Sequence, residues 1–206
     1  MMKKSEKSGF TLIELLIVVA IIAILAAIAI PNFLAAQTRA RVSRVKGEEQ
    51  TLTTALESYF VDYNVYPDDI DPTGWPWYLP SVISTPIAYI STGLINDLFR
   101  QGMPSAIPGT PGTRYRYINY DAELKGHNSA QAEAWFPHPG DTVEVQTAIR
   151  KYGFWRLSSA GPDRVATYTD AAGHGFFDGL AVYDPSNGTV SNGDIIRSQK
   201  GVVTEE

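Results

Sequence analysis

One stretch of the sequence decides the fold of this chain: FTLIELLIVVAIIAILAAIAIPNFL, residues 10–34. Glu14 is its only charged residue, and residues 15–30 are apolar without interruption. A helix of this length, rising about 1.5 Å per residue, reaches about 37 Å and crosses the ~30 Å hydrocarbon core of a bilayer with some tilt. The stretch therefore predicts a membrane-spanning helix.

Two features distinguish this helix from a cleaved secretory signal. A secretory signal places its apolar run before a small-residue cleavage site, whereas here Gly9 precedes the run, so a cut after Gly9 keeps the helix. Glu14 is a carboxylate inside apolar sequence, where an unpaired charge costs about 2.5 kcal/mol or more and usually marks function. The alternative is that Glu14 lies at the level of the lipid headgroups.

A basic leader, MMKKSEKSG, precedes the apolar stretch. Together they resemble the class III (prepilin) signal of type IV pilins and of the pseudopilins of type II secretion systems, and the major pseudopilin most of all. The resemblance implies that a prepilin peptidase cuts after Gly9, that the new amino group of Phe10 is methylated, and that Glu14 and Pro31 act in assembly. It also implies the partners: further copies of the chain in a helical filament, minor pseudopilins and an inner-membrane assembly platform.

The bulk composition limits what the rest of the chain can be. With 206 residues there is enough chain for one globular head beyond the helix. The net charge of −5 does not favour nucleic-acid binding, and without cysteine the head has no disulfide. The lysine-rich leader keeps the amino terminus cytoplasmic by the positive-inside rule, so the head lies in the periplasm or outside the cell. Four basic residues beyond the apolar run reduce the difference in positive charge on which this orientation depends: Arg39, Arg41, Arg44 and Lys46.

The helix is predicted to continue past the membrane. Pro31 removes one backbone hydrogen bond, so we expect a kink or a local loosening there. Beyond it, apolar residues recur at helical spacing: Val42, Val45, Leu52, Leu56, Tyr59 and Tyr63. We therefore expect one helix from Phe10 to Tyr63, with a membrane and assembly half at 10–34 and an amphipathic half at 35–63. Asn64 and Pro67 end it.

Residues 64–206 are predicted to form the head of an α+β pilin fold, with a small antiparallel sheet across the helix. A loop at 64–112 includes a short helix near Ser84–Leu98 and an aromatic cluster whose side chains are either an exposed patch or packed beneath the loop: Trp75, Trp77 and Tyr78. The sheet is expected at about 113–158, from strands at 114–120, 142–149 and 152–157, with a hairpin at Arg150–Lys151.

The last segment, 159–206, is predicted to be a loop region with turn-forming clusters and scattered carboxylates. It resembles the carboxyl-terminal loop of major pseudopilins, which implies a structural calcium ion, and oxygen ligands on flexible loops suit that ion. The candidate ligands are Asp163, Asp178, Asp184 and Asp194. The alternative is that these aspartates cap turns and remain solvated.

The sequence does not predict an enzyme, since it has no phosphate loop, no nucleophile elbow and no histidines at metal-ligand spacing. We expect a structural subunit that polymerises into a type II secretion pseudopilus. A major or minor type IV pilus subunit is the alternative within this class. A membrane-tethered periplasmic binding module, using the Trp75–Tyr78 loop, is the alternative from another class.

Overall fold

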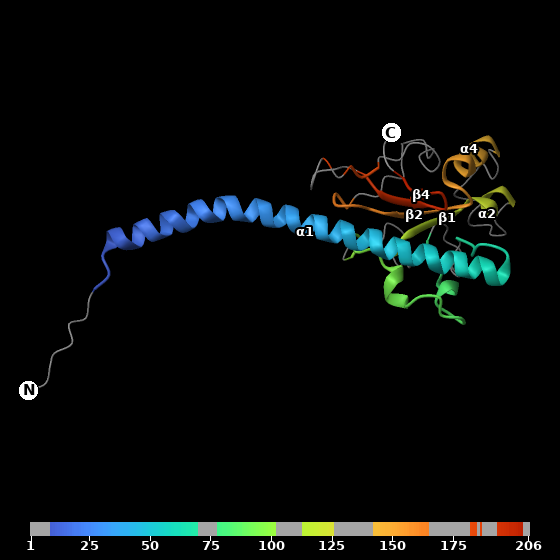
Figure 1. The fold of residues 1–206 in the computed structure, drawn as a ribbon, viewed down its shortest axis with the longest axis horizontal. Helices are drawn as coiled ribbons and strands as arrows, with labels where there is room; N and C mark the ends of the chain where they lie inside the picture. Colours follow the sequence, from blue (N-terminus) through green and yellow to red (C-terminus); the bar gives the residue numbers. More distant parts are fainter. Residues whose placement is uncertain are drawn as a thin grey trace, which may run out of the picture.

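The computed structural model describes residues 9–69, 78–101, 113–125, 142–164, 182–184, 186 and 193–203. One long helix, α1 (Leu12–Tyr63, 52 residues), projects from a head built on its carboxyl-terminal half (Figure 1). Asn64 ends α1 in the left-handed conformation, with φ 56°, and its N–H donates to the carbonyl of Phe60 at 2.7 Å. The predicted continuous helix and its cap are confirmed.

α1 stays helical through Pro31, and Figure 1 shows a smooth curve rather than a sharp bend. The proline leaves the Ala27 carbonyl without its usual helical donor. Because the helix around Pro31 is exposed on all sides, nothing within the described part of the chain forces a larger bend there. The expected loosening is therefore confined to the hydrogen-bond ladder.

The head contains a four-stranded antiparallel sheet in the order β1-β2-β3-β4. The strands are β1 (Arg116–Asn119), β2 (Trp155–Ser159), β3 (Ile195–Ser198) and β4 (Gly201–Val202). Tyr117 lies opposite Leu157, which lies opposite Arg197, so these three side chains share the face directed at α1. The predicted α+β pilin-like architecture, a long helix packed on a small antiparallel sheet, is confirmed.

Each face of the sheet has its own core. The face toward α1 packs against buried residues of the helix at Val42, Val45, Leu52, Ala55 and Leu56. The opposite face is covered by α2 (Tyr120–Lys125) and α4 (Thr142–Tyr152), where the smaller core contains Ile118, Tyr120, Val145, Ala148 and Tyr152. Two 3₁₀ turns, η1 (Ser81–Ile83) and η2 (Thr92–Ile95), lie across α1 from the sheet (Figure 1).

Three predictions for the head are wrong. Residues 142–149, predicted to be a strand, belong to helix α4, and the hairpin expected at Arg150–Lys151 is the last turn of that helix. In the range Ser84–Leu98, where a short helix is expected, the structure has only the 3₁₀ turn η2, since η1 ends at Ile83. The sheet is not confined to 113–158, because β3 and β4 come from the segment predicted to be loop.

Candidate functional site

The amino terminus of α1 is closed by a capping box. The Thr11 hydroxyl accepts a hydrogen bond from the Glu14 amide N–H at 3.3 Å. In return, Glu14 Oε2 accepts from the amide of Thr11 at 2.9 Å and from its hydroxyl at 2.7 Å. The other carboxylate oxygen, Oε1, makes no hydrogen bond within the described residues. Glu14 therefore caps its own helix and still has one oxygen to offer a partner.

Gly9 and Phe10 lie immediately outside the helix. Phe10 is 74 % exposed, and a Cβ added to Gly9 would meet nothing within 4 Å. Neither packing nor a positive φ therefore requires glycine at this position. A glycine that the local structure does not require is compatible with recognition of Gly9 by a peptidase. The cleavage and methylation sites stay predictions.

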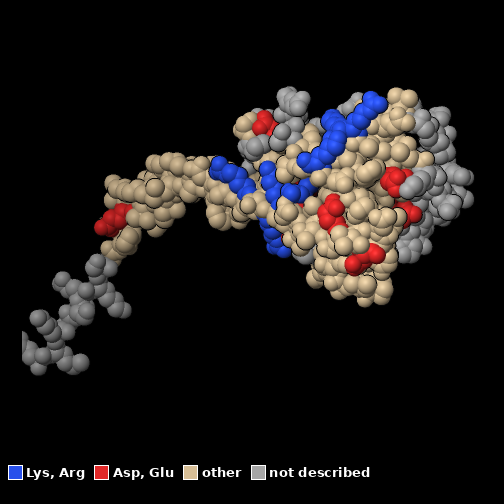
Figure 2. Space-filling model, turned by 45° about the vertical axis from the view of Figure 1, so that its right-hand side comes forward, with Lys and Arg blue, Asp and Glu red and all other residues tan. Residues whose placement is uncertain are grey.

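The amino-terminal half of α1 is apolar all round and makes no contact with the head (Figures 1 and 2). Its large side chains from Leu12 to Leu34 are about half exposed or more. By length and composition this helix is apolar enough to cross a membrane, and its apolar stretch is not buried against the head. A helix that is hydrophobic on every side requires a surrounding apolar medium, either lipid or other helices.

The carboxyl-terminal half of α1 instead directs carboxylates into the head. Glu48 accepts a hydrogen bond from the Tyr115 hydroxyl at 2.7 Å. Glu57 accepts from the Tyr66 hydroxyl at 2.9 Å and from the Trp155 indole N–H at 3.0 Å. These bonds join the helix to the residue before β1, to the first residue of β2 and to the segment that follows the helix.

Glu49 is the exception among these carboxylates. Its side chain is only 2 % exposed, and its Oε1 atom is buried without a hydrogen-bond partner in the described part of the chain. The negative charges of Asp97 and Asp194 lie near its carboxylate. The positive charges of Lys46 and Arg197 lie near it as well. Burial, with Asp97 adding to it, raises the pKa of Glu49 well above its ordinary value.

The environment also shifts the pKa of two tyrosines and of Asp97, a further buried carboxylate near Glu49. Burial, and then the bond to Glu57, raises the pKa of Tyr66 to about 12. Burial raises the pKa of Tyr115 as well, and the bond to Glu48 adds to that shift. The pKa of Asp97 is raised by burial, although donors at Ala160, Ser159 and Phe99 oppose the shift. The tyrosines consequently remain hydrogen-bond donors at neutral pH.

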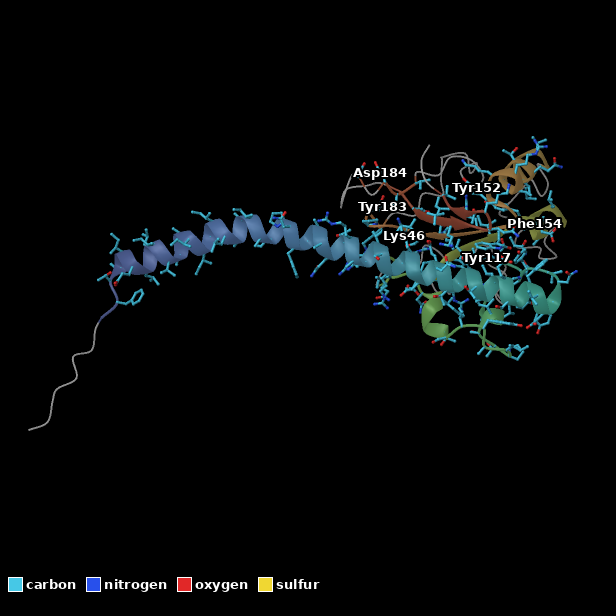
Figure 3. The ribbon with its side chains drawn as sticks, viewed as in Figure 1. Lys46, Tyr117, Tyr152, Phe154, Tyr183 and Asp184 are labelled. Atoms are coloured by element: carbon cyan, nitrogen blue, oxygen red, sulfur yellow. The ribbon has the colours of Figure 1, made fainter. Side chains whose placement is uncertain are left out.

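The predicted calcium ligands are brought only partly together. Asp163 accepts a hydrogen bond from the Gly193 N–H at 3.2 Å, next to buried Asp194. The Asp194 carbonyl in turn accepts from the N–H of Tyr183, the residue before Asp184. The carboxylate of Asp184 accepts hydrogen bonds from both the N–H and the hydroxyl of Ser186, and Figure 3 shows Asp184 next to Tyr183.

The contacts of Asp184 fit the turn-capping alternative, whereas Asp163 instead joins two segments 30 residues apart. No group of three or more acidic or histidine side chains that could hold a metal is present among the residues that the structure describes. Asp178 lies outside those residues, as do Trp75 and Trp77, whereas Tyr78 is buried. Calcium binding stays a prediction that depends on donors beyond the described part.

Sequence reasoning missed two features of this region. The capping box has a readable signature, because Thr11 and Glu14 have the Thr-x-x-Glu spacing. Glu49 also had a signal, since it lies four residues after Val45 and three before Leu52, on the helix face predicted to be buried. A charged residue at such a position is expected to be paired or to have a shifted pKa.

Comparison with known proteins finds similarity in the amino-terminal part of the chain. Residues 4–30 match the family described as prokaryotic N-terminal methylation motif. Over its amino-terminal third the chain is similar to type IV pilins and to a type II secretion protein, as the leader predicted. No solved structure matches it significantly.

The individual relatives come from both branches of that class. The chain is 52 % identical to the type IV major pilin protein PilA of Myxococcus xanthus over 67 residues, 32 % of this chain and 30 % of the relative. It is 39 % identical to the type II secretion system core protein G of Pseudomonas aeruginosa over 66 residues, 32 % of this chain and 46 % of the relative. The chain thus spans less than half the length of these relatives.

Proposed function

We propose that this chain is the structural subunit of a filament, built by helical packing of the amino-terminal halves of α1. The observation that carries the proposal is the contrast within one continuous helix: residues 12–34 are apolar and exposed, while the half from Val42 onward is packed in a head. Apolar surface of this kind is stable in a bilayer before assembly and against other copies afterwards. Repeated heterologous contacts between copies produce an open filament.

Processing and location follow from the same proposal. A prepilin peptidase removes residues 1–9 and the amino group of Phe10 is methylated, with the leader in the cytoplasm and the head in the periplasm. The subunit then enters a filament in the periplasm or at the cell surface, through an inner-membrane assembly platform and with minor subunits. The match of residues 4–30 to the methylation motif supports the processing step.

Within this class we favour a type II secretion pseudopilus. The chain has no cysteine to close a carboxyl-terminal loop with a disulfide, and the relatives include a secretion-system core protein. The similarity to PilA supports the alternative, a type IV pilus subunit. Deleting the chromosomal copy distinguishes them: loss of protein secretion with surface pili intact supports the first, and loss of surface pili with normal secretion supports the second.

We propose that Glu14 acts in the assembly of subunits into the filament. We expect its carboxylate to pair with the amino group of Phe10 in a neighbouring copy, which offsets the desolvation of both charges and fixes the axial stagger. The capping box complicates a simple alanine test, because Glu14→Ala removes the charge and the cap together.

Three variants separate these roles. Glu14→Gln removes the charge and keeps an oxygen that can cap the helix, whereas Thr11→Ala weakens the cap and keeps the charge. Filament yield by electron microscopy should be lost in Glu14→Gln and Glu14→Ala and kept in Thr11→Ala. The opposite pattern, with Glu14→Gln assembling and Thr11→Ala failing, would reduce Glu14 to a helix cap. Stable membrane-bound monomers of the wild-type chain would refute the filament itself.

A further inference from the structure

The charges of α1 are distributed in a way that filament packing of the apolar half leaves unexplained. Between Glu14 and Glu48 every charged residue is basic, and all four lie within eight residues of one another: Arg39, Arg41, Arg44 and Lys46. Figure 2 shows this basic cluster where the bare helix meets the head. On the far side of a membrane such residues oppose the orientation set by the leader, so their presence needs a compensating role.

Two of the four have partners within the protein. Arg44 forms an ion pair with Glu48, at 2.8 Å. The ammonium group of Lys46 lies 5.9 Å from the ring centre of Tyr183, a cation–π arrangement seen beside α1 in Figure 3. Arg39 and Arg41 are exposed, and neither forms an ion pair within the described residues, although Arg39 lies near the uncharged ring of Tyr183.

The depth of Arg39 and Arg41 matches a lipid headgroup layer. The ~30 Å hydrocarbon core takes about 20 helical residues, which residues 15–34 supply. Arg39 then lies about 7 Å beyond the core, and Arg41 about 10 Å, which is the depth of the polar headgroups. Side chains of an α-helix slant toward its amino terminus, so both guanidinium groups slant back toward the membrane.

Their position around the helix also suits a membrane. At about 100° per residue, Arg39 and Arg41 lie on opposite sides of α1. A protein partner docking on one side of the helix would contact only one of them, whereas a headgroup layer surrounds the helix and reaches both. Because α1 is continuous from Leu12 to Tyr63, the spacing between the apolar half and these arginines is fixed by the helix.

We infer that Arg39 and Arg41 form a binding site for anionic phospholipid headgroups of the leaflet next to the head. Guanidinium groups bind phosphate with paired hydrogen bonds as well as charge. The contact holds the unassembled subunit at a defined depth, and it must be released when the subunit leaves the bilayer for a filament. Each basic residue near an anionic surface contributes a factor of about five in affinity, the equivalent of about 1 kcal/mol.

The test is lipid selectivity of the full chain in vesicles of 70 % phosphatidylcholine and 30 % phosphatidylglycerol, by electron spin resonance. Trace spin-labelled phosphatidylglycerol or phosphatidylcholine reports the fraction of lipid that the protein immobilises. The double variant Arg39→Gln/Arg41→Gln is compared with Arg150→Gln/Lys151→Gln, which removes the same charge from exposed positions at the end of α4. Leader lysines are present in every variant and contribute equally.

We expect the wild type to favour phosphatidylglycerol several-fold, with less preference at high salt because the contact is electrostatic. Arg39→Gln/Arg41→Gln should lose most of this preference and the α4 control should keep it. Equal preference in wild type and Arg39→Gln/Arg41→Gln would overturn the inference and leave the proposed filament subunit intact. No immobilised lipid in any variant would mean that α1 is not in the bilayer, which would overturn both proposals.

Discussion

The two halves of α1 form one helix but differ in every surface property. From Leu12 to Leu34 the helix has a single charged residue and an exposed apolar surface on all sides. From Val42 to Tyr63 it is amphipathic, with a buried stripe and four carboxylates directed at aromatic or buried groups of the head. The second half has its partner in the same chain, whereas the first needs a partner from outside. One helix can thereby connect a folded head to a membrane or a filament without a flexible joint.

The largest expected effect concerns removal of the leader that precedes the amino-terminal half of α1. Gly9→Leu should abolish processing and leave both halves of the helix unchanged, because a side chain at Gly9 enters open space. Mass spectrometry of membrane fractions should show wild-type chain beginning at methylated Phe10 and variant chain retaining residues 1–9. Wild-type protein that keeps its leader would contradict the prepilin assignment, and cleavage of the variant would remove Gly9 from the recognised site.

The same substitution in the two halves should have very different effects on stability. Leu52 is fully buried, so Leu52→Ala should lower the free energy of unfolding of the head by about 2 to 5 kcal/mol. Leu25 is 62 % exposed and lies outside the head, so Leu25→Ala should change it by less than about 0.5 kcal/mol. Urea unfolding of the full chain in detergent, followed by tryptophan fluorescence, measures both. Similar losses from the two variants would mean that the halves of α1 do not unfold independently.

Much of α1 could be predicted because its signals are local and long. The apolar run, the helical recurrence from Val42 to Leu56 and the cap at Asn64 each extend over enough residues to be read without tertiary structure. The strand β1 was also predicted, since Arg116–Asn119 lies within an alternation of polar and aromatic residues.

The rest of the head depends on contacts that short segments do not encode. The valines and threonines of Thr142–Tyr152 favour strands, yet Val145, Ala148 and Tyr152 lie on one side of α4 and pack against the sheet, and that burial decides the outcome. Its carboxyl end carried a readable helix signal, Arg150 and Lys151 followed by Gly153 at φ 88°. Strand β3 begins with two adjacent isoleucines and shows no alternation of apolar and polar residues, and it is held in the sheet by its pairing with β2.

The head and the half of α1 that packs against it are held either by packing alone or by packing together with an ion. An ion that binds only the folded head stabilises it by about 2.7 kcal/mol at a hundredfold excess over its dissociation constant. If the predicted calcium site exists, the full chain in detergent should melt several degrees higher in millimolar calcium than in chelator, and Asp163→Ala should remove most of the difference. Asp184→Ala serves as a comparison, because its carboxylate already accepts two hydrogen bonds from Ser186. Identical melting in calcium and chelator would favour aspartates that only cap turns.

The smallest expected effect arises from Glu49, the carboxylate that the head buries without a hydrogen bond to Oε1. Its folded-state pKa is raised, so between about pH 4.3, where the unfolded chain ionises, and that raised pKa, the folded head retains a proton that the unfolded chain has lost. This group's contribution to stability is therefore full at acidic pH and declines as the pH rises through that window. Above the folded-state pKa the remaining penalty is constant.

Glu49→Gln removes this titration, so the free energy of unfolding of the variant should equal that of the wild type near pH 4 and exceed it at pH 8. The expected difference at pH 8 is on the order of 1 kcal/mol, because Lys46 and Arg197 already offset part of the penalty. Glu57→Gln is the matched control in the same helix. Its carboxylate accepts bonds from Tyr66 and Trp155, so the amide should weaken both and lower stability at neutral pH. If Glu49→Gln raises the free energy of unfolding at pH 8 and Glu57→Gln lowers it, the head-facing side of α1 tolerates carboxylates only where the head supplies hydrogen-bond donors. Parallel pH profiles for wild type and Glu49→Gln would instead mean that water or a residue outside the described part already satisfies Glu49.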